Sequence, residues 1–145
     1  MTPRPARAED AEAARALVRA AYAPWVPVVG REPGPMRDDY AALIAAGAVW
    51  ITADGTGLCV LLEKEGALLL DNIAVAPSAQ GRGIGRGLVA FAAAEAGRRG
   101  LPAVVLYTHV RMETNIALYA RLGFRETHRA HEGGFDRVYM RLDLD

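Results

Sequence analysis

The stretch Ile73–Gly87, which reads IAVAPSAQGRGIGRG, decides how the rest of the chain is interpreted. It begins as an apolar strand, is interrupted by Pro77, and then carries glycine at every second position from 81 to 87. Glycine lets the backbone adopt positive φ and approach a ligand closely. A helix is expected to follow over about 83–99, and the unpaired N–H groups at its start, with the positive end of its dipole, favour an anion. The stretch therefore predicts a phosphate cradle.

Two other phosphate-binding motifs do not fit this loop. A P-loop ends in Gly-Lys-Ser/Thr, whereas the only lysine of the chain is Lys64, upstream of the loop. The dinucleotide-binding fingerprint needs glycine at i, i+2 and i+5, and counting from Gly81 or Gly83 the third position is not glycine. A flexible linker remains an alternative, but a linker has no need of Arg82 and Arg86 at the start of a helix.

Composition places the chain among single-domain globular proteins. Its 145 residues fit one domain, 1–145, and 17 basic residues balance 17 acidic ones, which argues against a nucleic-acid partner. The single cysteine, Cys59, lies in an apolar run and is expected to be a buried hydrophobe. No apolar run approaches the roughly 18 residues of a membrane span, so no membrane association and a cytoplasmic location are expected. His128 and His131 lack the spacing of a metal site, and no metal is expected.

The first half of the chain alternates between helical and extended patterns. Helices are expected from about Ala8 to Tyr22 and from about Met36 to Ala46. Four of the eight prolines fall within 23–35, where regular structure is not expected. Three apolar runs follow, and the turn pairs Asp54-Gly55 and Glu65-Gly66 separate them, which predicts an antiparallel meander over 48–53, 57–63 and 67–76.

The second half adds a strand over 103–107, a helix over about 113–122 and two final strands. In the last of these, over 137–143, Val138, Met140 and Leu142 alternate with Arg137, Tyr139 and Arg141 and are expected to point inward. A meander combined with crossovers predicts an α/β sandwich built on one mixed sheet.

A second motif lies in Asn115–Phe124, which reads NIALYARLGF. Asn115 and Tyr119 are four residues apart and fall on one face of the predicted helix. With the pattern Q-x-x-G-x-G over 80–85, this motif resembles the GCN5-related N-acetyltransferase (GNAT) superfamily. The order of elements agrees from the first strand to the last, so the resemblance covers essentially the whole chain.

The resemblance implies an acetyl-CoA-dependent N-acetyltransferase with a mixed, mostly antiparallel sheet whose central strands splay apart between flanking helices. The splay would admit the thioester, the strand edge would pair with the pantetheine arm, and the N–H of Val75 would stabilise the oxyanion. A non-catalytic acyl-CoA sensor of the same fold is the alternative, and a simple interaction module is disfavoured by the paired motifs. The implied cofactor-binding residues are Ile73, Ala74, Val75, Gln80, Gly81, Arg82, Gly83, Ile84, Gly85, Arg86 and Asn115.

Two residues are expected to move protons. Tyr119 would donate a proton to the leaving thiolate, because a phenol is protonated at pH 7, although it could instead be an aromatic of the core. Asp71 interrupts an apolar run, and an acid there is costly to bury unless it works or is paired, so it is either the general base or the partner of an arginine. Glu32, Asp39, His109 and ordered water remain alternatives for the base.

The acceptor is expected to be a primary amine of a small molecule or a peptide. The proline-rich segment and its flanks gather aromatic and acidic residues, which suit a cation, although these residues could instead complete the core or be solvated. Since many members of the family dimerise, a homodimer is compatible with the sequence. The acceptor residues expected here are Tyr22, Trp25, Glu32, Met36, Asp39 and Tyr40.

Overall fold

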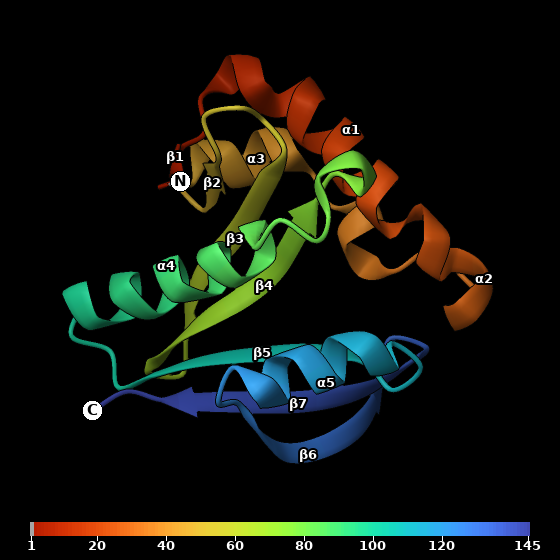
Figure 1. Cartoon of the computed structure of the whole chain (residues 1–145), viewed down its shortest axis with the longest axis vertical. Helices are drawn as coiled ribbons and strands as arrows, with labels where there is room; N and C mark the ends of the chain where they lie inside the picture. Colours follow the sequence, from red (N-terminus) through yellow and green to blue (C-terminus); the bar gives the residue numbers. More distant parts are fainter. Residues whose placement is uncertain (1) are drawn as a thin grey trace.

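The computed structural model describes residues 2–145, which form one seven-stranded sheet with helices on both faces (Figure 1). The strand order is β1-β2-β3-β4-β5-β7-β6, and β4 and β5 are the one parallel pair among these neighbours. The strands are β1 (Arg4–Pro5), β2 (Val49–Ile51), β3 (Gly57–Lys64), β4 (Ala67–Val75), β5 (Ala103–His109), β6 (Arg125–Glu132) and β7 (Phe135–Asp143). The mixed, mostly antiparallel sheet and the meander of β2, β3 and β4 confirm the expected fold class.

The sheet separates the core into two layers, each covered by helices. Those on one face, α4 and α5, pack against a cluster that includes Leu68, Leu106 and Val138, and those on the other, α1 and α3, pack against a cluster that includes Val49, Leu58 and Val60. The helices are α1 (Ala11–Tyr22), α2 (Val26–Val29), α3 (Tyr40–Ala45), α4 (Ile84–Arg98) and α5 (Glu113–Arg121), with 3₁₀ turns at Ala8–Asp10, Ala23–Trp25, Gly34–Arg37 and Pro77–Ala79.

The proline-rich segment is more regular than its composition suggests. The chain continues from α1 through a 3₁₀ turn into the single turn of α2, because Pro24 and Pro27 each occupy the first turn of a new helical unit, where a missing N–H costs no hydrogen bond. The expected helix over 36–46 is also shorter. Asp39 caps α3 by accepting a hydrogen bond of 3.1 Å from the N–H of Ala42, which separates α3 from the preceding 3₁₀ turn.

The central strands β4 and β5 separate soon after they meet. Their parallel pairing is limited to Leu68 with Val104 and Leu69 with Val105, and beyond these pairs the strands diverge (Figure 1). The expected splay is therefore present, and it leaves one edge of β4 without a neighbouring strand over its second half.

A β-bulge lies in β4 where the splay begins. Val60 of β3 pairs with Asn72, whereas Leu61 pairs with Leu70, so Asp71 is an extra residue with no partner on β3. Bulges bend a strand and re-aim its side chains, and they are frequent beside active sites.

The bulge also exchanges the faces to which β4 sends its side chains. Before it, Leu70 packs in the core cluster under α4 and α5. After it, Ala74 packs under α1 and α3, while Ile73 and Val75 pack on the α4 side. In a regular strand, residues 70 and 74 are four positions apart and would point to the same face.

Candidate active site

Two pockets meet at the splay. The first, here called the splay pocket, lies between β4, β5 and β7 and is covered by the segment that follows α2. The second, here called the loop groove, runs between the glycine loop, the end of α1 and the start of α5. Four residues line both: Tyr22, Ile73, Asn115 and Tyr119. These four therefore mark the place where the pockets join.

The glycine loop has the backbone geometry of an anion cradle. Gly81 and Gly83 have φ of +83° and +81°, which a residue with a side chain adopts only with strain, and a Cβ at either position would meet nothing within 4 Å. Gly83 caps α4, whose first backbone bond runs from the N–H of Gly87 to the C=O of Gly83 at 3.0 Å. The N–H groups of residues 84–86 precede that bond and have no partner within the helix, so they fit a phosphate.

The polar side chains of the loop have different positions. Gln80 lines the loop groove, and its Nε2 donates to the carbonyl oxygen of Val75 at 3.3 Å. Arg86 also lines the groove, whereas Arg82 is exposed and lies outside it. A guanidinium at the start of a helix adds full charge to the dipole at the same point, so the groove favours an anionic ligand.

The free edge of β4 turns alternate peptide groups into the splay. Residues 74 and 76 face β3, because Ala74 pairs with Leu58 and the N–H of Ala76 donates to Thr56 at 2.8 Å. The intervening residues face the other way. The carbonyl of Ile73 accordingly accepts a hydrogen bond of 3.1 Å from the Tyr22 hydroxyl. The N–H groups of residues 73 and 75 thus point toward the gap, whereas Ala74 is buried away from it.

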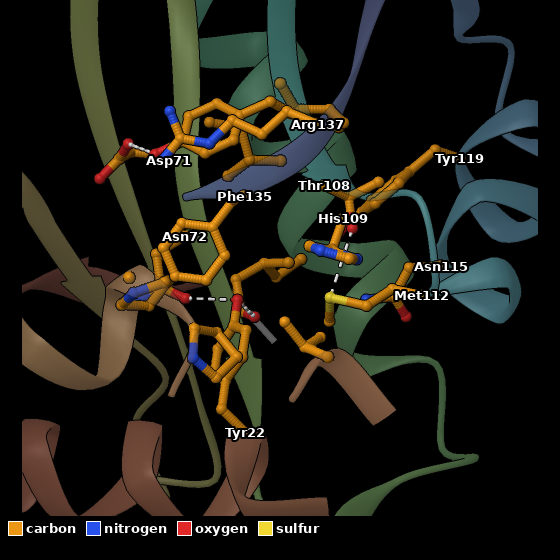
Figure 2. Close-up of a pocket in the computed structure, with 18 residues that line it drawn as sticks. Tyr22, Asp71, Asn72, Thr108, His109, Met112, Asn115, Tyr119, Phe135 and Arg137 are labelled. Atoms are coloured by element: carbon orange, nitrogen blue, oxygen red, sulfur yellow. Dashed lines mark hydrogen bonds between the residues drawn. The ribbon is translucent and has the colours of Figure 1, made fainter. Parts of the chain in front are cut away.

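Asp71 is half-buried in the wall of the splay pocket. Its Oδ1 accepts a hydrogen bond of 3.2 Å from the Tyr107 hydroxyl, and the guanidinium of Arg137 lies 4.3 Å from the centre of the Tyr107 ring (Figure 2). Burial raises the pKa of Asp71, while this hydrogen bond and the positive charges of Arg137 and Lys64 act in the opposite direction. Asp71 thus faces a pocket, as a base would, and its hydrogen-bond partner is a tyrosine rather than the arginine expected as the alternative.

Tyr119 stands at the junction of the pockets, one helical turn after Asn115. It is 6% exposed, and its ring meets that of Phe124 edge to face at 5.8 Å. Burial raises the pKa of its hydroxyl well above the ordinary value, so the phenol is protonated at neutral pH and can donate. Tyr119 therefore belongs both to the core and to the pocket wall.

A buried amide that sequence reasoning missed lies beside the junction. Asn72 is 2% exposed, and its Oδ1 accepts a hydrogen bond of 2.8 Å from the Tyr22 hydroxyl (Figure 2). Its Nδ2 donates to the Tyr40 hydroxyl at 2.7 Å. Tyr40 in turn donates to the carbonyl of Pro35 at 2.6 Å. The available signal was a second polar residue, directly after Asp71, in an otherwise apolar strand. This network joins the end of α1 and the proline-rich segment to β4.

Most of the expected acceptor residues do not line the splay pocket. Tyr22 does, but Trp25 lines the loop groove, and Glu32 is half-exposed and paired with Arg19 at 3.3 Å. Asp39 is occupied as the cap of α3.

The remaining two, Met36 and Tyr40, are buried in the core at 7% and 0% exposure. Their place on the pocket wall is taken by residues of β5 and β7, among them Tyr107, Phe135 and Arg137. Strand alternation predicted that Arg137 points away from the core, but not which pocket it faces.

The roof of the splay pocket is fastened to the opposite wall by two arginines. The guanidinium of Arg31 lies 4.4 Å from the centre of the Phe135 ring, and its Nη1 donates to the carbonyl of Gly134 at 3.5 Å. Arg111, which follows β5, donates to the carbonyl of Val28 at 3.3 Å. The segment 28–35 thus forms a strap across one side of the pocket.

The other titratable residues suggest no second centre. Within residues 2–145 no group of three or more His, Cys, Asp or Glu side chains could hold a metal. His128 stacks on Tyr139 at 4.3 Å, and His131 pairs with Asp136 at 2.7 Å. His109 lines the splay pocket, and burial lowers its pKa. Over the same residues, no helix has both the length and the apolar character that a bilayer crossing requires.

The sequence of this region matches a family model. Residues 40–126, which contain the glycine loop, the splay and both Asn115 and Tyr119, match the model described as "Acetyltransferase (GNAT) domain". The chain belongs to the GNAT acetyltransferase family. No curated protein matches it in sequence.

Solved GNAT structures show the same fold. The PaiA N-acetyltransferase from Thermoplasma acidophilum, in complex with coenzyme A, has a TM-score of 0.80 at 18% identity over 98% of both chains. The ribosomal-protein-S18-alanine N-acetyltransferase from Escherichia coli has a TM-score of 0.74 at 23% identity over 99% of this chain and 94% of its own. A Bacillus subtilis acetyltransferase in complex with CoA has a TM-score of 0.60 at 28% identity, covering 67% of this chain and 75% of its own.

Proposed function

We propose that this GNAT protein is an acetyl-CoA-dependent N-acetyltransferase that acts on a primary amine. The observation that carries the proposal is the junction of the loop groove with the splay pocket, where Tyr119 lines both. An anion-binding groove on one side and a pocket with a carboxylate on the other would bring an acyl carrier and an amine to one point. Two reactants held in that way react as if in one molecule.

The loop groove fits the cofactor, which supplies an acetyl group already activated as a thioester. The free N–H groups of residues 84–86 and the positive-φ glycines would hold the pyrophosphate. The unpaired edge of β4 would align the pantetheine amides, as an added strand aligns on a sheet. Relatives solved with CoA support this assignment.

The chain's own residues account for both proton transfers. The amine forms the new amide bond as the carbon–sulfur bond breaks, and the proton that the amine loses would pass to Asp71, directly or through water. Tyr119 would give its proton to the departing sulfur. The N–H of Val75, which points into the splay, would stabilise the negative charge on the carbonyl oxygen.

The strap favours a compact amine over a polypeptide as acceptor. Arg31 and Arg111 join the two sides between which an extended chain would have to pass. The carboxylate of Asp71 and the rings of Tyr107 and Phe135 suit an ammonium group on a small molecule. A peptide is the second candidate, supported by the fold shared with an enzyme named for a protein N-terminal alanine.

A thiol-release assay across small amines, polyamines and peptides tests the proposal, with isothermal titration to measure acetyl-CoA binding. Small amines should be acetylated faster than peptides. Arg31→Ala loosens the strap and should bring the acetylation rate of peptides closer to that of small amines. The matched control Arg15→Ala removes an exposed arginine on α1 and should leave the ratio of the two rates unchanged. Binding without turnover on any amine would assign the protein as a sensor instead, and no binding at millimolar acetyl-CoA would contradict both functions.

A further inference from the structure

One hydrogen bond crosses the splay just where backbone pairing stops. The last pair of β4 and β5 is Leu69 with Val105, and two residues further along each strand stand Asp71 and Tyr107. The Tyr107 hydroxyl donates to Asp71 Oδ1 at 3.2 Å. A side-chain bond between residues 36 positions apart thus takes the place of the next rung of the sheet.

The bond is the first link of a chain of contacts that extends across the C-terminal strands. Arg137 of β7 covers the Tyr107 ring at 4.3 Å, and its Nη1 lies 3.6 Å from Glu132 of β6. The ring of Tyr139, also on β7, lies with its centroid 5.6 Å from that of Tyr107. Stacking of this kind restricts the rotation of the ring, and it therefore fixes where the hydroxyl points.

We propose that Tyr107 and Arg137 are positioning residues for Asp71: Tyr107 holds its carboxylate at the mouth of the splay, and Arg137 holds Tyr107. This inference rests on the proposed role of Asp71 as the base. It also explains why Asp71 is an extra residue in β4, since a carboxylate on a bulge is free of the β3 ladder and can be aimed from the β5 side.

The charged and titratable groups that surround Asp71 come from every element packed around it. The hydroxyl of Tyr107 on β5, the guanidinium of Arg137 on β7 and the ammonium of Lys64 on β3 all favour the ionised carboxylate. Burial disfavours it, and burial together with the charge of Asp71 in turn raises the pKa of its titratable neighbours Asp38, which precedes α3, Tyr40 of α3 and Tyr22 of α1. Because burial raises the pKa of Tyr107 to about 12, its hydroxyl remains a donor throughout the working pH range.

The pH dependence of kcat/KM tests the inference. As pH falls, Asp71 becomes protonated and activity should be lost along an acid limb. Tyr107→Phe removes a donor and Arg137→Gln removes a positive charge, so each should raise the pKa of Asp71 and move that limb to higher pH, by about 0.5 to 1 pH unit. Two acceptors with different amine pKa values should be compared, because the limb of the enzyme is the one that does not change with the acceptor.

Three further variants make the result decisive. Tyr139→Phe is the matched control, because its hydroxyl bonds to Glu132 rather than Asp71, and it should leave the limb in place. Arg137→Lys keeps the charge and should return the limb most of the way to that of the wild type. Unchanged affinity for acetyl-CoA, by titration, identifies variants that are folded. Asp71→Asn should abolish the limb and lower kcat by about 10²-fold.

The outcomes separate the two proposals. If Asp71→Asn keeps wild-type activity, Asp71 is not the base and the proposed mechanism fails. If Asp71→Asn is inactive while Tyr107→Phe and Arg137→Gln keep the wild-type limb, the mechanism stands and the positioning role is overturned. An equal shift in Tyr139→Phe would also overturn it, because a general loosening of the sheet would then explain the effect.

Discussion

The hydroxyl of Tyr22 donates a hydrogen bond of 2.8 Å to Oδ1 of Asn72, across 50 residues of sequence. Tyr22 is the last residue of α1, and Asn72 follows the bulge in β4, so the bond fixes the helix to the strand beside the junction of the pockets. The amide also binds Tyr40, which makes Asn72 the centre of a buried polar network.

Replacing Asn72 should therefore destabilise the fold. Asn72→Leu fills a similar volume but deprives two hydroxyls of a partner, and the free energy of unfolding should fall by about 1–3 kcal/mol. Urea unfolding followed by tryptophan fluorescence measures the loss. Tyr22→Phe leaves the Nδ2 bond to Tyr40 intact but removes the donor to both Asn72 Oδ1 and the carbonyl of Ile73, so it should cost a similar amount, about 1–3 kcal/mol. Equal stability of Asn72→Leu and wild type would show that the network contributes nothing.

Removal of the Tyr119 hydroxyl should separate catalysis from binding. Tyr119→Phe keeps the ring against Phe124 and deletes the donor, so kcat should fall by about 10²- to 10⁴-fold while the Kd for acetyl-CoA stays nearly constant. Steady-state thiol release and isothermal titration give the two values. A large loss of affinity with unchanged kcat would instead make Tyr119 a binding residue.

The glycine loop should tolerate no side chain at Gly83. Gly83→Ala forces a left-handed backbone at a cost of about 1–2 kcal/mol and puts a methyl group where the anion would approach, so both stability and cofactor affinity should decrease. Gly100→Ala is the matched control. Gly100 follows the other end of α4, has φ of +72° and likewise meets nothing within 4 Å. It should lose similar stability without losing affinity, and an equal loss of affinity would argue against a cradle at the loop.

The thiol of Cys59 should not react with thiol reagents in the native protein. It is 0% exposed, and burial raises its pKa to about 12, so almost no thiolate exists at neutral pH. Ellman's reagent should detect no thiol in the folded chain and one per chain in urea. Rapid reaction without denaturant would contradict the burial of Cys59 and would also add a background to thiol-release assays.

Local motifs made one side of the site predictable. The glycine loop and the pair Asn115 and Tyr119 are each contained in a few consecutive residues, so their spacing was enough to carry the resemblance to the GNAT superfamily, and the lone acid Asp71 stood out in an apolar strand. Gly81, Gly83 and Gly85 line the loop groove together with Asn115 and Tyr119, so the two motifs meet at one groove.

The other side of the site depends on contacts that spacing does not encode. Tyr107 meets Asp71 only because β5 follows β4 for two pairs and then departs. Sequence does not distinguish which aromatic and acidic residues around the proline-rich segment face a pocket. Tyr40 is buried in the core, and Asp39 caps α3. Only Tyr22 of that set reaches the splay pocket.

The bulge at Asp71 is equivalent to a one-residue insertion in β4 relative to β3. Substitutions along the strand leave the register between β4 and β3 intact, so their effects should remain local. Deletion of Asp71 would restore simple alternation, because Leu70 and Asn72 would then be successive residues on opposite faces, and residues 72–75 would keep their partners on β3. The bulge therefore lets β4 hold one residue more than β3 without changing the register on either side, and the residue added in this way is the carboxylate that faces the splay pocket.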